Sequence, residues 1–193
     1  MIKVQQFEHA ADFLKNTHEL LLLNEAENNL IIGLANRLSQ DPSAYLSTPF
    51  FAVVEEDNKI ILAVLMTPPH NILISSFTDE PLNALQALSD YLWQSGIPVN
   101  GVNSSKKVAK LFSTLWTNRA TLTSKIKMEE MIYRLDHIIV PQMPEGVFRK
   151  ANMADYPLLK EWMPAFHHEA LNEPLPFFAD MPLHLANVLE QIN

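Results

Sequence analysis

The feature that most constrains the fold is a change of hydrophobic period between residues 40 and 50. Before it, apolar residues recur at spacings of three and four in HAADFLKNTHELLLL and EAENNLIIGLANRLSQDP, which predicts two amphipathic helices. After it, PFFAVVEE and KIILAVLM are rich in strand-forming residues and flank a polar turn at residues 56–59, which predicts a hairpin. NILISSF adds a third strand beyond the break at Pro68 and Pro69.

The rest of the first 140 residues alternates between strands and helices. Ile2 and Val4 predict a short first strand, and PVNGVNSS predicts another. Helices are predicted in DEPLNALQALSDYLWQSG, with Asp79 as N-cap and Gly96 as the stop, and in SSKKVAKLFSTLWTNR. ATLTSKIKMEEMIYRLDHIIV is predicted to be extended. The order β-α-α-β-β-β-α-β-α-β indicates an α/β domain with helices packed on a mixed sheet.

Charge and cysteine content disfavour several functional classes. The chain has 22 acidic and 14 basic residues and a net charge of -8, whereas nucleic-acid binding requires a basic patch. Its densest basic cluster, Lys106, Lys107 and Lys110, is interpreted as a solvated helix face. The acidic balance disfavours anionic membranes, and the longest apolar stretches, such as IILAVLM, are too short to span a bilayer. With no cysteine and no secretory signal at the N-terminus, we expect a soluble, cytoplasmic protein without disulfides.

Three segments in order, NEAENNLIIGL, AVLMTPPHNILIS and MIYRLDHIIVP, are followed by GVFRKANMADYPLLKEW. Together they resemble the GNAT superfamily of N-acetyltransferases, in its bacterial branch with two GNAT-like halves. The resemblance implies a GNAT-like domain over residues 1–140, a linker over 141–146 and the start of a second copy over 147–193. FRKA would be the first strand of that copy, Asp155 would cap its first helix, and PLHLANVLEQIN would be its second helix. The chain would then be a fragment; the alternative is a short protein whose tail packs on the first domain.

The resemblance also implies acetyl-CoA as cofactor, held by a turn of the form Gln/Arg-x-x-Gly-x-Gly/Ala after the fourth strand. The corresponding residues 75–85 contain neither a glycine nor a basic residue. Asp79 and Glu80 would repel a pyrophosphate, and Pro81 lacks a backbone N–H donor. We therefore expect no cofactor-binding residues in this chain, and place the cradle of a full-length relative in the second copy, beyond Asn193.

Catalytic candidates are few. His167, His168 and Glu169 do not form a His-Glu-x-x-His motif, and adjacent histidines point to different sides of a helix, so no metal site is predicted. By the resemblance, Glu169 is a candidate general base or amine contact; the alternative is an ordinary surface carboxylate. Trp162 and Phe166 are interpreted as core residues.

Two functions remain open from the sequence. The first is acetyl transfer from acetyl-CoA to a small-molecule or peptide amine at the level of the family, with this chain inactive by itself. The second is a non-catalytic binding or scaffold domain that shapes an acceptor pocket or pairs with another chain. Because the tail carries an apolar face without a sheet of its own, we expect it either to dock on the first domain or to form a homodimer through residues 147–193.

Overall fold

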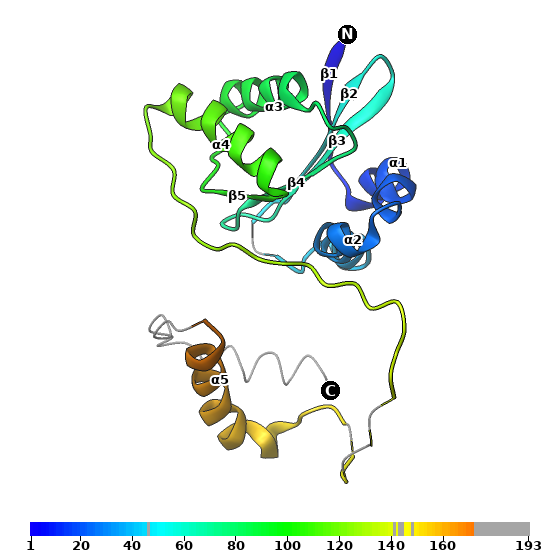
Figure 1. Cartoon of the computed structure of the whole chain (residues 1–193), viewed down its shortest axis with the longest axis vertical. Helices are drawn as coiled ribbons and strands as arrows, with labels where there is room; N and C mark the ends of the chain where they lie inside the picture. The colour runs from blue at the N-terminus through cyan, green and yellow to red at the C-terminus, as the bar shows by residue number, and fades with distance from the viewer. Residues whose placement is uncertain (46, 141, 143–144, 148, 172–193) are drawn as a thin grey trace. The chain divides into compact units, whose positions relative to one another are not determined.

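The computed structural model describes residues 1–45, 47–140, 142, 145–147 and 149–171 (Figure 1). By its internal contacts the chain divides into two compact units, Met1–Asp136 and His137–Asn193, which are described separately. No helix in the described part of the chain is both long and apolar enough to cross a membrane.

The first unit contains five strands and four helices in its described residues. The strands are β1 (Ile2–Phe7), β2 (Phe50–Glu56), β3 (Lys59–Met66), β4 (Ile72–Ser76) and β5 (Val102–Ser104). The helices are α1 (Ala10–Leu22), α2 (Glu25–Gln40), α3 (Leu82–Gln94) and α4 (Lys106–Ala120). This confirms the predicted α/β class and the order of these nine elements.

The strands form one mixed sheet in the order β1-β2-β3-β4-β5. Antiparallel pairs join the first four strands, with Val4 opposite Val54 and Val64 opposite Ile74. The β2–β3 pair turns at Asp57 and Asn58, whose φ angles of 50° and 64° are the positive values of a primed hairpin turn. The last pair, β4 with β5, is parallel.

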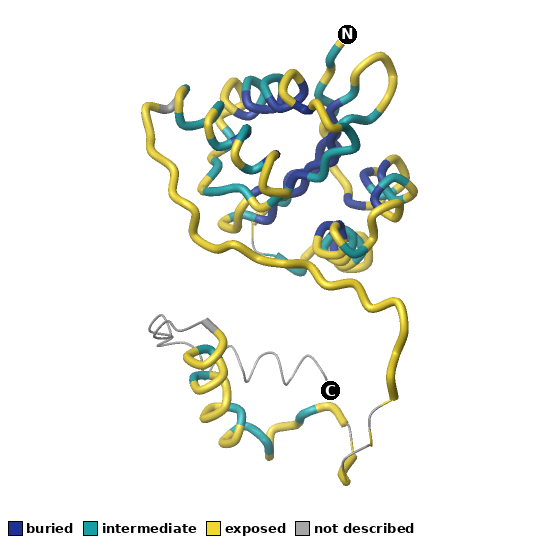
Figure 2. The backbone as a smooth tube through the Cα atoms, viewed as in Figure 1, coloured by how far each residue is buried: buried dark blue, intermediate teal, exposed yellow. Residues whose placement is uncertain are grey.

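The core lies on both faces of the sheet (Figure 2). On one face α3 and α4 bury Leu88 and Phe112 against Val54 and Leu62. On the other face α1 and α2 contribute Phe13 and the other buried apolar side chains of those helices to a cluster with alternate residues of β2 and β3. Both faces of these two central strands are therefore covered, which explains why their sequences are almost continuously apolar rather than alternating.

Residues 121–136, here called the arm, differ from the prediction. The sequence predicted an extended strand after α4, but the arm contains no strand and leaves the sheet with five (Figure 1). The chain leaves α4 through Thr121, whose φ of 54° ends the helix. β5 is paired over only three residues, so it offers a short edge on which to add a sixth strand.

The described part of the second unit contains a 3-10 turn, η1 (Met153–Asp155), and the helix α5 (Tyr156–Leu171). Asp155 is not the N-cap that the sequence predicted. Asn152 takes that position and accepts from the N–H of Ala154, while Asp155 accepts from the N–H of Asn152. A capping box thus begins the helical segment.

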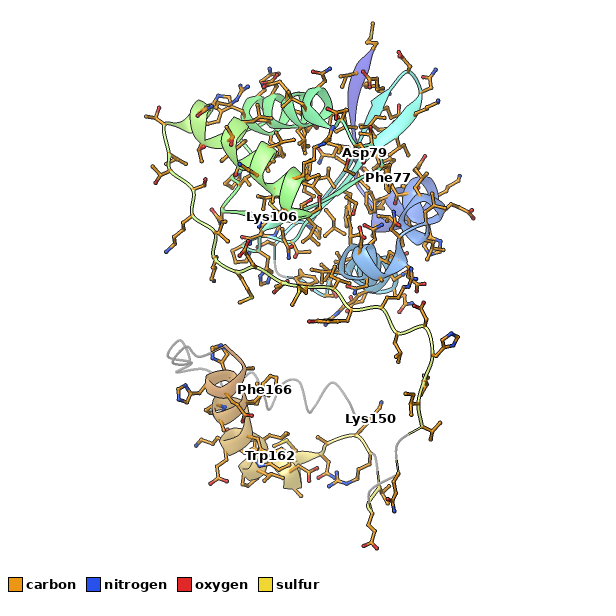
Figure 3. The ribbon with its side chains drawn as sticks, viewed as in Figure 1. Phe77, Asp79, Lys106, Lys150, Trp162 and Phe166 are labelled. Atoms are coloured by element: carbon orange, nitrogen blue, oxygen red, sulfur yellow. The ribbon has the colours of Figure 1, made fainter. Side chains whose placement is uncertain are left out.

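Two other predictions for this unit differ from the structure. Arg149–Ala151 form no strand, and Phe148 and residues 182–193, the predicted second helix, lie outside the described residues. Trp162 and Phe166, interpreted as core, are 62% and 73% exposed on α5 (Figure 3). They are one helical turn apart, so they form an exposed aromatic stripe.

Candidate functional site

The carboxyl ends of β4 and β5 are the place where this sheet could bind a ligand. Ligands of α/β folds commonly lie beyond the carboxyl ends of parallel strands, and β4–β5 is the one parallel pair of the described sheet. The ladder ends where Ile74 lies opposite Ser104, because β5 stops there while β4 continues to Ser76. The hydroxyl of Ser104 donates to the carbonyl of Ile74 and closes the pair at that point.

Two helices begin at this end of the sheet, α3 after β4 and α4 after β5. Neither N-cap residue, Pro81 or Ser105, makes a side-chain capping hydrogen bond. The first N–H groups of a helix attract anions, so two helix starts at one sheet end would ordinarily favour a phosphate. The turn between β4 and α3 decides whether they do here.

That turn, residues 76–81, is closed by bonds to its own side chains. The N–H of Thr78 donates to Oγ of Ser76 at 3.4 Å, and the N–H of Glu80 donates to Oγ1 of Thr78 at 3.3 Å. The next residue is Pro81, which has no N–H. Two N–H donors of the turn are therefore already bonded and Pro81 supplies none, while Asp79, labelled in Figure 3, adds an exposed carboxylate.

Lys107 of α4 fixes the turn from the side. Its Nζ donates to the backbone carbonyl of Asp79 and lies 3.6 Å from Oε1 of Glu80. The side chain of Asp79, predicted to cap α3, makes no such bond; α3 begins three residues later, at Leu82, after Pro81. Lys106 pairs with Glu129 of the arm at 3.0 Å. These two lysines are exposed, as predicted, but each is engaged by an acidic residue.

A buried polar contact holds β4 from the face of the sheet that α1 and α2 cover. The sequence pattern did not predict it. Asn28 of α2 accepts from the hydroxyl of Ser75 at 2.7 Å and donates through Nδ2 to the carbonyl of Leu21 at 2.9 Å. Asn28 precedes Ile31 by three residues, in phase with the buried stripe of α2, and that phase was the available signal. The contact ties the end of α1 to the strand segment where β4 and β5 part.

The catalytic candidates of the tail lie in the second unit. Glu169 is exposed on α5, next to His168. Among the described residues, no group of three or more His, Asp or Glu side chains could hold a metal ion.

The first unit also has two shallow concave surfaces away from the β4–β5 end. One, of about 420 Å³, lies beside β1 and is lined by Gln5, Gln6, Phe7, Glu8, His9, Asp12, Lys15 and Asn16. The other, of about 310 Å³, is lined mainly by apolar residues, including Trp93 and Trp116. The rings of these two tryptophans meet edge to face at 5.9 Å.

Comparisons with protein-family models, curated proteins and solved structures found no match to this chain. The residues of the site itself are therefore the basis for assigning a function. Its parallel strand pair and two helix starts have the topology of an anion or cofactor site, whereas its turn is internally bonded and carries two carboxylates.

Proposed function

We propose that this chain carries a GNAT-like domain of an acetyl-CoA-dependent N-acetyltransferase, and that Met1–Asp136 does not itself hold the cofactor. The element order supports the first half of the proposal: strand, two helices, three antiparallel strands, helix, parallel strand, helix. The turn between β4 and α3 supports the second half, because the N–H groups of Thr78 and Glu80 already donate to side chains of the turn and Pro81 has no N–H.

In this proposal the acceptor is a small-molecule or peptide amine in a cytoplasmic enzyme. A cofactor site elsewhere in the enzyme supplies the acetyl group, and the attacking amine must be deprotonated before it reaches the thioester carbonyl. Glu169, an exposed carboxylate on α5, keeps its role as candidate proton acceptor. The net charge of -8 would draw cationic amines toward the protein, which affects encounter rates more than identity.

Titration calorimetry of the full chain with acetyl-CoA tests whether the chain lacks a cofactor site, as proposed. We expect no binding in the micromolar range and no thiol release when acetyl-CoA and a panel of amines are added. The variant Asp79→Asn/Glu80→Gln separates the effect of charge from that of geometry. We expect this variant also to show no binding of acetyl-CoA, because the N–H groups of Thr78 and Glu80 are already bonded. A wild-type dissociation constant near 1 μM, about -8 kcal/mol, would contradict the proposal.

The second candidate is a purely non-catalytic binding or scaffold domain. The internally bonded turn favours this candidate, because a domain without a cofactor-binding turn of its own need not take part in catalysis. Calorimetry with the same amines in the absence of acetyl-CoA, together with a measurement of chain pairing, distinguishes the two forms of this candidate. Heat from an amine without cofactor would support an acceptor pocket in this chain, while pairing between chains would support a scaffold.

A further inference from the structure

Asn100 and Gly101 immediately precede β5, and they are the one Asn-Gly pair in the sequence. The amide carbon of an asparagine side chain can be attacked by the backbone nitrogen of the next residue. Glycine leaves that nitrogen most open, because it has no Cβ. Asparagine is accordingly among the residues that limit the chemical stability of proteins. The contacts of these two residues in the fold decide whether the reaction occurs in the folded chain.

The side chain of Asn100 is free to turn toward Gly101. It is exposed and lies in no helix or strand. Its only hydrogen bond to the described residues runs from Nδ2 to the carbonyl of Pro69 at 3.4 Å, which is longer than the usual N–H···O range and holds the amide weakly. Asn103 is exposed as well, but it lies within β5 opposite Leu73, and the ladder keeps its backbone extended. Asn103 is therefore an internal control.

The backbone of Gly101 presents the attacking nitrogen. Its carbonyl accepts from the N–H of Ile72 at 2.9 Å, which anchors the residue, whereas its own N–H donates to no acceptor among the described residues. The nitrogen must lose its proton before it attacks. An N–H that has no acceptor in the protein can lose that proton to solvent without first breaking a hydrogen bond.

Packing gives Gly101 a structural reason to be glycine. A Cβ at this position would lie 2.5 Å from Oδ1 of Asn71, so any other residue would push that side chain aside. Replacing Gly101 would therefore change the packing as well as the reactivity. For this reason the tests below are made at Asn100.

From these contacts we propose that Asn100 is a site of deamidation in the folded protein, and that its isoaspartyl product unpairs β5 from β4. The nitrogen of Gly101 gives up its proton and bonds to Cγ of Asn100, while the bond from Cγ to Nδ2 breaks and ammonia leaves with one proton in exchange. Water then opens the cyclic imide. Opening at Cγ gives aspartate, whereas opening at the backbone carbonyl gives isoaspartate, in which the chain runs through Cβ and Cγ.

The isoaspartyl product acts on β5 because it lengthens the backbone. The extra backbone carbon lies directly before a strand that pairs with β4 over three residues, from Val102 opposite Ile72 to Ser104 opposite Ile74. So short a ladder has few hydrogen bonds to resist a shift of the chain. Both products also replace the amide that donates to Pro69 by a carboxylate, which has no proton to donate. Since β5 leads into α4, the change reaches the candidate site at the carboxyl ends of β4 and β5.

Peptide mapping of the full-length chain during storage at mildly alkaline pH tests the modification. Mass spectrometry, with fragmentation that distinguishes aspartate from isoaspartate, follows each asparagine. We expect Asn100 to convert at least about tenfold faster than Asn103, and faster still at higher pH, because the attacking nitrogen must be deprotonated. The matched variant Asn100→Gln should stay intact at that position, since its longer side chain would have to form a larger and less favourable ring.

The same incubation in urea shows whether the fold permits the reaction. We expect Asn100 in the folded chain to convert at a rate within about tenfold of its rate in the unfolded chain. Conversion in urea but not in buffer would mean that the fold protects Asn100. Equal rates at Asn100 and Asn103 in the folded chain would remove the role assigned to Gly101. Either result overturns the proposed site.

Hydrogen exchange at the amide of Ile72 tests the effect on β5, because that N–H donates to the carbonyl of Gly101. The isoaspartyl form is separated chromatographically from the unmodified chain. We expect its Ile72 amide to exchange at least about tenfold faster, while the amides of β3 stay protected. Asn100→Asp carries the same new charge on an ordinary backbone and should keep the protection of Ile72.

Two outcomes would overturn the proposed effect on β5. Unchanged protection of Ile72 in the isoaspartyl form would show that β5 stays paired with β4. An equal loss of protection in Asn100→Asp would assign the effect to the charge rather than to the longer backbone. The modification does not depend on any acetyltransferase function.

Discussion

Oγ of Ser75 donates a 2.7 Å hydrogen bond to Oδ1 of Asn28, which joins residues 47 positions apart in the chain. Asn28 is buried, and its amide also donates to the last turn of α1. This side chain therefore links two helices to the strand that leads into the candidate site.

Replacing Asn28 by alanine should destabilise the fold, because the carbonyl of Leu21 and the hydroxyl of Ser75 lose a buried partner. We expect a loss of about 1–3 kcal/mol in the free energy of unfolding, measured by urea denaturation. Asn29→Ala, at an exposed neighbour on the same helix, is the matched control and should change it by less than about 0.5 kcal/mol. Equal effects of the two substitutions would contradict the role assigned to Asn28.

The buried face of α2 gives a second stability test. Leu30 and Ile31 both belong to the apolar pattern that predicted α2, but Ile31 is 3% exposed and Leu30 is 48% exposed. Ile31→Ala should cost about 2–5 kcal/mol through lost burial and a cavity, while Leu30→Ala should stay within about 0.5 kcal/mol. Thermal and urea unfolding of both variants would show whether the helix is rotated as described.

The ion pair at the start of α5 predicts a pH dependence. Arg149 donates two 2.7 Å hydrogen bonds to the carboxylate of Asp155, and the N–H of Asn152 donates another. These bonds, those from Arg149 most of all, lower the pKa of Asp155 to about 2 from an ordinary 3.8. Because the pKa is lower in the folded state, the stabilisation is present above pH 4 and is lost as the pH falls through about 2.

Carboxyl-carbon NMR titration of Asp155 should show this low pKa directly. Arg149→Gln should raise it toward 3.8, whereas Lys150→Gln, at the exposed neighbouring position, should leave it low. A pKa near 3.8 in the wild-type chain would mean that the capping box does not persist in solution.

Substitutions in the aromatic stripe of α5 test whether two chains pair through residues 147–193. Trp162→Glu/Phe166→Glu should lower the mass measured by light scattering if the tails of two chains meet there, since two large apolar side chains would become charged. Lys160→Gln is the control on the same helix and should leave the mass unchanged. An unchanged mass in the aromatic variant would exclude this stripe as the contact.

Local patterns were enough to predict much of the first unit. Asp57 and Asn58 predict a tight hairpin turn through residue type alone, because few residues other than glycine tolerate positive φ. The stop at Gly96 follows from the same physics, with a φ of 66° just after α3. Residues 75–85 contain no glycine but do contain two carboxylates, and both facts led to the expectation of a poor phosphate cradle. That expectation remains a prediction about binding.

Contacts between distant residues could not be predicted in this way. The sequence determined by itself which segments are helical or extended, because those preferences arise between residues a few positions apart. The tertiary structure alone decided that Lys107 of α4 contacts Asp79, that Asn28 rather than Leu30 faces the sheet, and that the arm adds no sixth strand. The arm has the composition of a strand, but a strand forms only where an edge of adequate length lies within reach, and β5 provides three residues.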